Sequence, residues 1–274
     1  MIFQDNVIKE YLKNVYFVTG TPCGGKTTVS RELAKRHNLL VYDVDEQFEK
    51  HQKASNAAFQ PAMNKVFKDA DEFFGRTVDE YKKWLVDNTR EQLDFVLLDL
   101  IRLSQKQIVL CDCHLTMEQA GKITEPSRIV FLIKEPVNII EDYCNRPGHQ
   151  GFSGFINSAS DTGKAKETCN ATLRSLNEKY YNDIKESGYF WLERTSGSTI
   201  GKTAGEVERH FGFVNLSQIK KVERNTDLAD KLIQFVENFS WEDVKEHTLW
   251  VLRNWEFSDW ETMFVALADN KLWQ

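Results

Sequence analysis

Short apolar runs of four to six residues recur along the first two thirds of the chain, separated by longer stretches of mixed polarity. They lie at Val15–Val18, Leu39–Tyr42, Gln107–Cys111, Arg128–Ile133 and Tyr189–Leu192. Such runs are typical of strands that are buried on both faces, which is the environment of a parallel sheet covered by helices. The pattern therefore predicts an α/β fold with a parallel five-stranded sheet and helices on both of its faces.

Helical periodicity fills most of the chain between these runs. It predicts helices over Asp5–Asn14, Glu46–Leu103 with a break at Phe73–Arg76, Val137–Cys144, Lys164–Ser187 and Thr199–Phe211. The stretch Asn145–Gly163 is polar and rich in glycine, which favours a loop.

The segment after the first apolar run carries the strongest motif. Residues Gly20–Thr27 match G-x-x-x-x-G-K-[ST] at every fixed position, and a helical pattern follows. In this motif backbone N–H groups point at phosphate oxygens, the lysine reaches the β- and γ-phosphates and the final hydroxyl ligates Mg²⁺. The order of strand, loop and helix argues against a chance match, a glycine-rich turn before an ordinary helix. We expect a nucleotide to contact Gly20, Thr21, Cys23, Gly24, Gly25, Lys26, Thr27 and Thr28.

Acidic residues follow the second and third apolar runs. Asp43 and Asp45 come directly after one strand, and Asp112 ends the next. Open α/β sheets bind ligands at the carboxyl ends of their strands, and alternation places Asp43 and Asp45 on one side. Asp112 lies where P-loop enzymes hold Mg²⁺ through an acidic residue. The alternatives are that Asp43 and Asp45 cap the next helix and that Asp112 is a solvated turn residue.

Composition limits the partners and the compartment. The net charge of −6 argues against nucleic acid as the main partner. The first residues lack a signal-peptide pattern, and no run approaches the roughly 20 apolar residues of a membrane span, so we expect no membrane partner. Five cysteines without a disulfide-like framework favour a cytoplasmic protein. We interpret Cys111 and Cys113 as buried residues rather than a metal or redox pair.

Residues 14–213 resemble P-loop kinases of the nucleotide- and shikimate-kinase type. The resemblance rests on the GTPCGGKTT loop, Asp43-Val44-Asp45, a helical acceptor-side insertion at about 46–103, a glycine-rich lid at about 145–163 and the ending YFWLERTSGSTIGKTAGEVERHFG. It implies the P-loop NTPase three-layer sandwich. It also implies that ATP and Mg²⁺ are the cofactors and that a phosphoryl group passes in line to a hydroxyl or phosphate of a small-molecule acceptor.

The same resemblance implies individual roles. Lys26 would stabilise the transferred phosphoryl group, Thr27, Asp43 and Asp112 would hold the metal, and Asp45 would orient or deprotonate the acceptor hydroxyl. Arg146 is the candidate arginine of the lid, with Arg174 as its alternative and Arg76 as a candidate at the acceptor site. Relatives commonly place this arginine within the helix after strand four, where this sequence has Tyr143-Cys144. His114 could also face the acceptor, although a lone histidine is more often structural.

The C-terminal segment differs in character, because five of the seven tryptophans lie after residue 213. Residues 217–274 are predicted to form a small α+β segment and resemble the truncated N-terminal part of a GNAT acetyltransferase, whose acyl-CoA loop would fall beyond residue 274. This resemblance implies no binding of acetyl-CoA. We interpret the tryptophans as core residues at helical spacing rather than a ligand box. The segment is expected to pack on the kinase-like domain or on a second copy of the chain as a homo-oligomer.

Two classes of function remain open. One is the phosphotransferase, favoured by Asp43, Asp45 and the lid. The other is an ATP-binding switch or partner-binding protein without phosphotransfer, favoured by the departure at the lid arginine and by the truncated tail. No motif in residues 46–103 identifies the acceptor.

Overall fold

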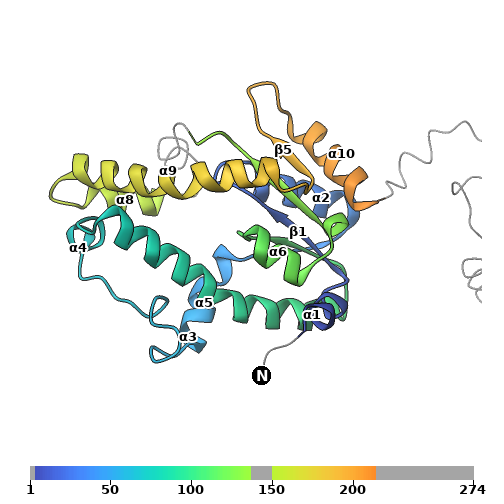
Figure 1. Cartoon of the computed structure of the whole chain (residues 1–274), viewed down its shortest axis with the longest axis horizontal. Coiled ribbons are helices and arrows are strands. Elements are labelled where there is room, and N and C mark those ends of the chain that lie inside the picture. Colours follow the sequence, from blue (N-terminus) through green and yellow to red (C-terminus); the bar gives the residue numbers. More distant parts are fainter. Residues whose placement is uncertain (1–3, 137–149, 214–274) are drawn as a thin grey trace, which may run out of the picture. The chain divides into compact units, whose positions relative to one another are not determined.

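The computed structural model describes residues 4–136 and 150–213. Its strands are β1 (Val15–Thr19), β2 (Leu40–Asp43), β3 (Val109–Asp112), β4 (Ile129–Ile133) and β5 (Trp191–Glu193). All paired strands run parallel, in the order β2-β3-β1-β4-β5 (Figure 1). The predicted fold class is therefore confirmed, with each strand beginning no more than two residues later than the sequence predicts.

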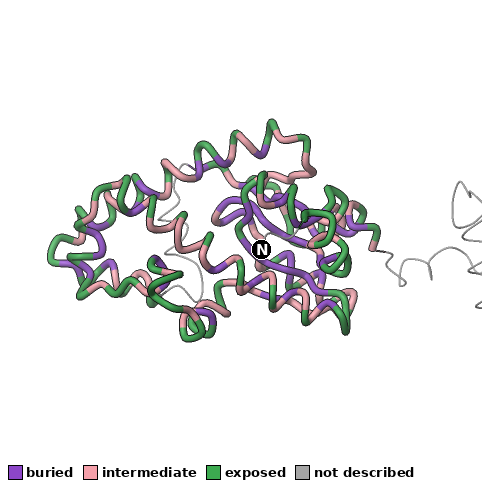
Figure 2. Tube along the Cα trace, turned by 60° about the horizontal axis from the view of Figure 1, so that its bottom comes forward, coloured by how far each residue is buried: buried purple, intermediate pink, exposed green. Residues whose placement is uncertain are grey.

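Helices cover both faces of this sheet. On one face α2 (Lys26–His37) and α10 (Ile200–Phe211) pack against Val18, Leu110 and Val130. On the other, α1 (Asp5–Tyr11), α5 (Val78–Ser104), α6 (Met117–Ile123) and α9 (Thr162–Glu186) contribute to a core that includes Phe17 and Cys111. Neighbouring strand residues thus belong to opposite cores, as the period of two requires. The inner strands β1, β3 and β4 are accordingly among the most buried parts of the chain (Figure 2), whereas the edge strands β2 and β5 are mostly half-buried.

Strand register brings the carboxyl ends of β1, β2 and β3 to one edge of the sheet. Val18 pairs with Asp112, and Asp112 pairs in turn with Asp43. The phosphate-loop motif leaves β1 at this edge. The register therefore gathers on one edge the acidic residues and the loop that are far apart in sequence.

The acceptor-side insertion is less helical than predicted. It contains η1 (Asp45–Gln47), α3 (Phe48–Ala54) and α4 (Ala70–Phe74) before α5, but residues 55–69 form turns. Asn56 Oδ1 accepts the Ala58 N–H at 2.8 Å, and Asn64 donates to Ser55 Oγ at 2.7 Å. These side chains stabilise turns in competition with a helix. Helix α5 then begins with a Thr77–Glu80 capping box.

Two α-helices and one 3-10 helix were not predicted. Helix α6 begins with a Thr116–Gln119 capping box after β3, and η2 (Pro126–Arg128) follows it. Helix α8 (Gln150–Asn157) replaces the loop expected over the first part of the glycine-rich stretch. Phe152, Phe155 and Ile156, at helical spacing, pack in the apolar cluster around Phe73 and Phe74. Their burial outweighs the low helix propensity of Gly151 and Gly154 in the same helix.

Two predicted features lie outside the described residues: the helix over Val137–Cys144 and the GNAT-like segment 217–274. Among the helices that the structure describes, none is long and apolar enough to cross a membrane.

Candidate functional site

The loop between β1 and α2 is pressed against β4. A Cβ atom added at Gly20 or Gly24 would collide with the main-chain carbonyl of Leu132. Gly20 and Gly25 also have φ values of 127° and 99°, which side chains disfavour. The glycines of the motif thus have a physical cause in this chain, since Gly20 and Gly24 permit the close approach of the loop to β4. Thr21 fastens the loop further, because its Oγ1 accepts the Lys134 N–H at 2.7 Å.

Lys26 is the first residue of α2 and curls back over this loop. Its Nζ donates to the carbonyl oxygens of Gly20 and Thr21 at 3.3 and 3.1 Å. The amino-terminal N–H groups of a helix carry partial positive charge and have no partners within the helix. The loop, the helix end and the ammonium group together form a site suited to the phosphates of an anionic ligand.

Asp43, Asp45 and Asp112 lie beside this loop at the end of the sheet. Asp43 Oδ1 accepts the Asp45 N–H at 3.1 Å, which stabilises the turn into η1. Neither Asp43 nor Asp45 is the N-cap of η1 or α3, whose N-cap residues are Val44 and Gln47. Asp112 is not a solvated turn residue, because it is 5% exposed. Its Oδ2 is buried and has no hydrogen-bond partner among the described residues.

The pKa of Asp112 is raised to about 6. Burial is the main cause and the negative charges of Asp43 and Asp45 add to it, whereas the charge of Lys26 and a hydrogen bond from Thr27 act in the opposite direction. A buried carboxylate with one oxygen left without a hydrogen bond is costly in the absence of a cation and is well suited to receive one.

These residues fit Mg²⁺. The described residues contain no cluster of three or more histidines, cysteines or acidic residues able to form a metal cage. Mg²⁺ needs no such cage, since it is commonly held by one or two carboxylates together with waters and substrate phosphates. Thr27, Asp43 and Asp112 offer hard oxygen ligands of this kind, next to the place where phosphates would lie.

The raised pKa of Asp112 leads to a prediction for the ligand-free protein. Because the folded-state pKa exceeds that of an exposed aspartate, the carboxyl favours folding while protonated and opposes it once ionised. The free energy of unfolding should decrease as pH rises from about 4 to about 6. Above that range the destabilisation by Asp112 is complete and no longer changes with pH. Asp112→Asn should therefore stabilise the protein at neutral pH by on the order of 2 kcal/mol, measured by urea unfolding.

The comparison of wild type and variant at several pH values provides the control for this prediction. The stability difference should shrink as pH falls and approach zero below about pH 3, where the wild-type carboxyl is mostly protonated in both states. A destabilised variant at neutral pH would contradict the assignment of Asp112 as an unsatisfied buried acid.

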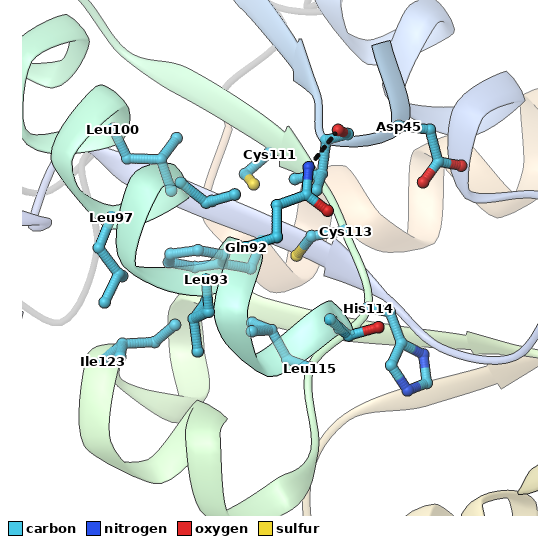
Figure 3. A pocket seen from close by; sticks show the side chains of 14 residues that line it. Asp45, Gln92, Leu93, Leu97, Leu100, Cys111, Cys113, His114, Leu115 and Ile123 are labelled. Carbon is cyan, nitrogen blue, oxygen red and sulfur yellow. Dashed lines mark hydrogen bonds between the residues drawn. The ribbon is translucent and has the colours of Figure 1, made fainter. Parts of the chain in front are cut away.

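A pocket opens next to Asp45 and extends between α5, α6 and the sheet (Figure 3). Gln92 and His114 line it near Asp45, and apolar side chains line its other end. Although His114 is exposed, the protein around its ring and the positive charge of Lys26 lower its pKa to about 4. His114 is therefore neutral at pH 7. The Gln92 Nε2 donates to the Val44 carbonyl at 3.0 Å, which fixes this side chain beside Asp45.

A second pocket lies between the phosphate loop and the segment that follows β5. It is lined by Gly24, Gly25 and Thr28 on one side and by Arg194, Ser198 and Thr199 on the other. Arg194 Nη1 donates to the Cys23 carbonyl at 3.0 Å. Arg194 was not among the predicted site residues, because its position next to the loop results from the pairing of β5 with β4. The sequence feature that could have indicated Arg194 is its position directly after the fifth apolar run, because parallel sheets bind ligands at the carboxyl ends of their strands.

The other candidate residues lie elsewhere or outside the described residues. Arg76 does not line the acceptor-side pocket; its guanidinium carbon lies 4.3–4.9 Å from the ring centroids of Phe67, Phe73, Tyr81 and Trp84. Arg174 forms a surface pair with Glu178 within α9. Arg146 lies outside the described residues. Cys111 and Cys113 are buried free cysteines, as predicted.

The fold and the loop together define a P-loop nucleotide-binding domain. Residues 17–126 match the family model described as "AAA domain". Among solved structures, the chain is similar to shikimate kinase from Acinetobacter baumannii in complex with shikimate. That similarity has 16% sequence identity and a TM-score of 0.38, and covers 76% of this chain and 95% of the other. No curated protein matches the chain.

Proposed function

We propose that the protein is an ATP-dependent phosphotransferase acting on a hydroxyl or phosphate group of a small-molecule acceptor. The observation that carries this proposal is the position of Asp45. It follows the strand paired with β3 at the site edge and also lines the pocket beneath α5. A phosphate-binding loop next to an acidic side chain at the mouth of a pocket is the arrangement that direct phosphoryl transfer requires.

In this proposal the described residues divide the work between nucleotide and acceptor. The loop N–H groups and Lys26 bind the phosphates, and the pocket beside Arg194 receives the base. Thr27, Asp43 and Asp112 would hold Mg²⁺, which when bound neutralises charge on the phosphates. Asp45 accepts a hydrogen bond from the acceptor hydroxyl and directs its oxygen toward the γ-phosphorus.

Arg146 is proposed as a further group that stabilises the equatorial oxygens, by resemblance alone, because it lies outside the described residues. Phosphoryl transfer spreads charge over these oxygens, and guanidinium groups are well suited to bind them. Helix α8 belongs to the proposed lid. Its apolar side chains pack in the cluster that includes Phe73 and Phe74 of α4.

The direct test is transfer of the labelled γ-phosphoryl group of ATP. The protein would be incubated with Mg²⁺, γ-labelled ATP and a panel of alcohols, nucleosides, nucleotides, sugars and hydroxy acids. Label should appear in one class of acceptor, and the product should carry one additional phosphoryl group by mass spectrometry. Tight ATP binding without transfer to any acceptor would instead support the nucleotide-switch function.

A further inference from the structure

The peptide unit that joins Val44 to Asp45 is held at both of its polar atoms. Its carbonyl oxygen accepts Gln92 Nε2 at 3.0 Å (dashed line in Figure 3), and its N–H donates to Asp43 Oδ1 at 3.1 Å. Because a peptide unit is planar, contacts at its two ends fix its rotation about the chain. The plane ends at the Cα atom of Asp45, so these contacts also set the direction in which the Asp45 side chain leaves the backbone.

The second contact of the Gln92 amide lies away from this peptide unit. Gln92 is 7% exposed, and its Nε2 lies 3.3 Å from His51 Nδ1 as well as 3.0 Å from the Val44 carbonyl oxygen. An amide nitrogen carries two hydrogens, so these two acceptors use both of them. The Gln92 amide therefore cannot turn over without losing both hydrogen bonds.

The His51 ring is held in turn by an acidic side chain. His51 is 2% exposed and stacks on Phe95 with ring centroids 5.6 Å apart. Its Nε2 lies 3.2 Å from Asp99 Oδ2, to which the Tyr42 hydroxyl also donates at 3.1 Å. A carboxylate only accepts, so Nε2 carries the ring hydrogen and Nδ1 is left to accept from Gln92. The hydrogen bonds thus form one consistently directed chain that ends at Asp99.

Asp99 is a well-compensated end for this chain. Lys50 and Arg102 pair with it at 2.5 and 3.2 Å. Burial acts against its charge, but hydrogen bonds from Lys50, His51 and Tyr42 outweigh burial and hold the pKa of Asp99 below its usual value. A polar network whose members are paired in this way restricts each of them to one arrangement.

The contact from Gln92 is not needed to satisfy the Val44 carbonyl. That oxygen also accepts the Gln47 N–H at 3.2 Å, within the turn into η1. An apolar side chain of similar size at position 92 would fill the same space without requiring a buried hydrogen-bond network. What the amide adds is orientation of the peptide unit before Asp45.

We propose that Gln92 and His51 are positioning residues for phosphoryl transfer, because they hold the peptide unit that directs the Asp45 carboxylate toward the acceptor hydroxyl. The inference rests on the proposed function and adds to it two residues that act through Asp45. Displacement of a reacting group by about 1 Å can lower a rate by on the order of a hundredfold, so a fixed peptide plane matters for transfer.

The first test needs no acceptor. Gln92→Met keeps the length of the side chain and removes its N–H groups, so hydrogen exchange at residues 43–47 of the ligand-free full chain should rise at least about threefold. The matched control is Asn88→Leu, one turn earlier on α5, which removes an amide that donates to the Ala62 carbonyl at 3.4 Å. This control should leave exchange at residues 43–47 unchanged. Unchanged exchange in Gln92→Met, or an equal rise in both variants, would overturn the inference.

The second test is a double-mutant cycle with Asp45→Ala, using γ-labelled ATP and the acceptor panel of the transfer assay. Gln92→Met alone should lower transfer about tenfold to a hundredfold per nucleotide site, with sites counted by calorimetry and affinity for a non-hydrolysable ATP analogue unchanged. In the Asp45→Ala background the same change should lower transfer less than about twofold, because its effect passes through the missing carboxylate. Effects that simply multiply would assign Gln92 a general structural role and overturn the inference.

His51→Phe provides a second variant if Gln92→Met does not fold. It keeps a ring to stack on Phe95 and removes both ring nitrogens, so exchange at residues 43–47 should rise and transfer should fall in the same pattern as for Gln92→Met. Thermal melting would show which variants are folded. Wild-type exchange and transfer in folded His51→Phe would contradict its role.

These outcomes are distinguishable from failure of the proposed function. Transfer from ATP to an acceptor that is unchanged in Gln92→Met would refute the positioning role and retain the phosphotransferase. Raised exchange at residues 43–47 without transfer to any acceptor would refute the phosphotransferase, and with it the role in transfer, while confirming that Gln92 holds this turn.

Discussion

Replacing Lys26 by alanine is expected to lower ATP-dependent phosphoryl transfer by on the order of 10²–10³-fold, with the fold retained. In the ligand-free protein the Lys26 ammonium group rests on the carbonyl oxygens of Gly20 and Thr21 and contributes no hydrophobic packing to the core. Its charge is therefore available to phosphates that displace these weak contacts. Backbone N–H groups supply partial charges only and cannot replace a full positive charge near the transferred group.

The matched control is Lys35→Ala, which removes an exposed ammonium group from the same helix. Transfer rates and nucleotide affinity should be close to wild type in this control. Circular dichroism and thermal melting would establish that both variants are folded. Unchanged nucleotide affinity and turnover in folded Lys26→Ala protein would be incompatible with the loop as the phosphate site.

Much of the fold could be predicted because its signals are local. The five apolar runs indicate strands buried on both faces, and the helical spacing of residues such as Val29 and Leu33 indicates which side of α2 faces the sheet. The loop motif is also read from a short stretch of sequence, although the structure shows that Gly20 and Gly24 are required by contact with the distant strand β4. The gathering of Asp43 and Asp112 at one edge follows from the rule that parallel strands end together.

Other features depend on contacts between distant segments. Helix α8 forms where the sequence is glycine-rich, because Phe152, Phe155 and Ile156 find an apolar surface supplied by α4. Arg76 appears in the sequence as a charged residue of an acceptor-side insertion, yet four aromatic rings surround it. Arg194 reaches the phosphate loop only through the pairing of β4 with β5. No local periodicity encodes these relationships.

The acceptor pocket illustrates the same limit. Its α5 side follows helical spacing through Gln92, Val96 and Leu100, a pattern that by itself indicates only a buried helix face. The pocket exists because that face does not fill the space between the sheet and α6. The sequence therefore predicts that an acceptor would bind beside Asp45. Which other side chains line the pocket there follows only from the packing of α5 and α6 on the sheet.

Replacing Asp45 by asparagine is expected to lower the acceptor-stimulated rate of ATP consumption by about a hundredfold or more, while ATP affinity stays near wild type. Asp45 lines the acceptor pocket and is not among the residues that line the pocket beside Arg194. An amide preserves the size of the side chain but is a weaker acceptor for the hydroxyl proton. The loss should therefore fall on transfer to the acceptor and not on nucleotide binding.

Asp43→Asn is the variant to compare with Asp45→Asn. Asp43 precedes Asp45 by two residues, but it pairs in register with Asp112, on the side of the proposed metal. Its replacement should weaken the Mg²⁺ dependence of ATP consumption whether or not an acceptor is present. Asparagine can still accept the Asp45 N–H, so the turn into η1 should be retained and a loss of activity would not reflect misfolding. If both residues served only to stabilise this turn, both substitutions would leave the kinetics nearly unchanged. Small and equal effects at the two positions, with ATP still bound, would favour a nucleotide-binding switch over a phosphotransferase.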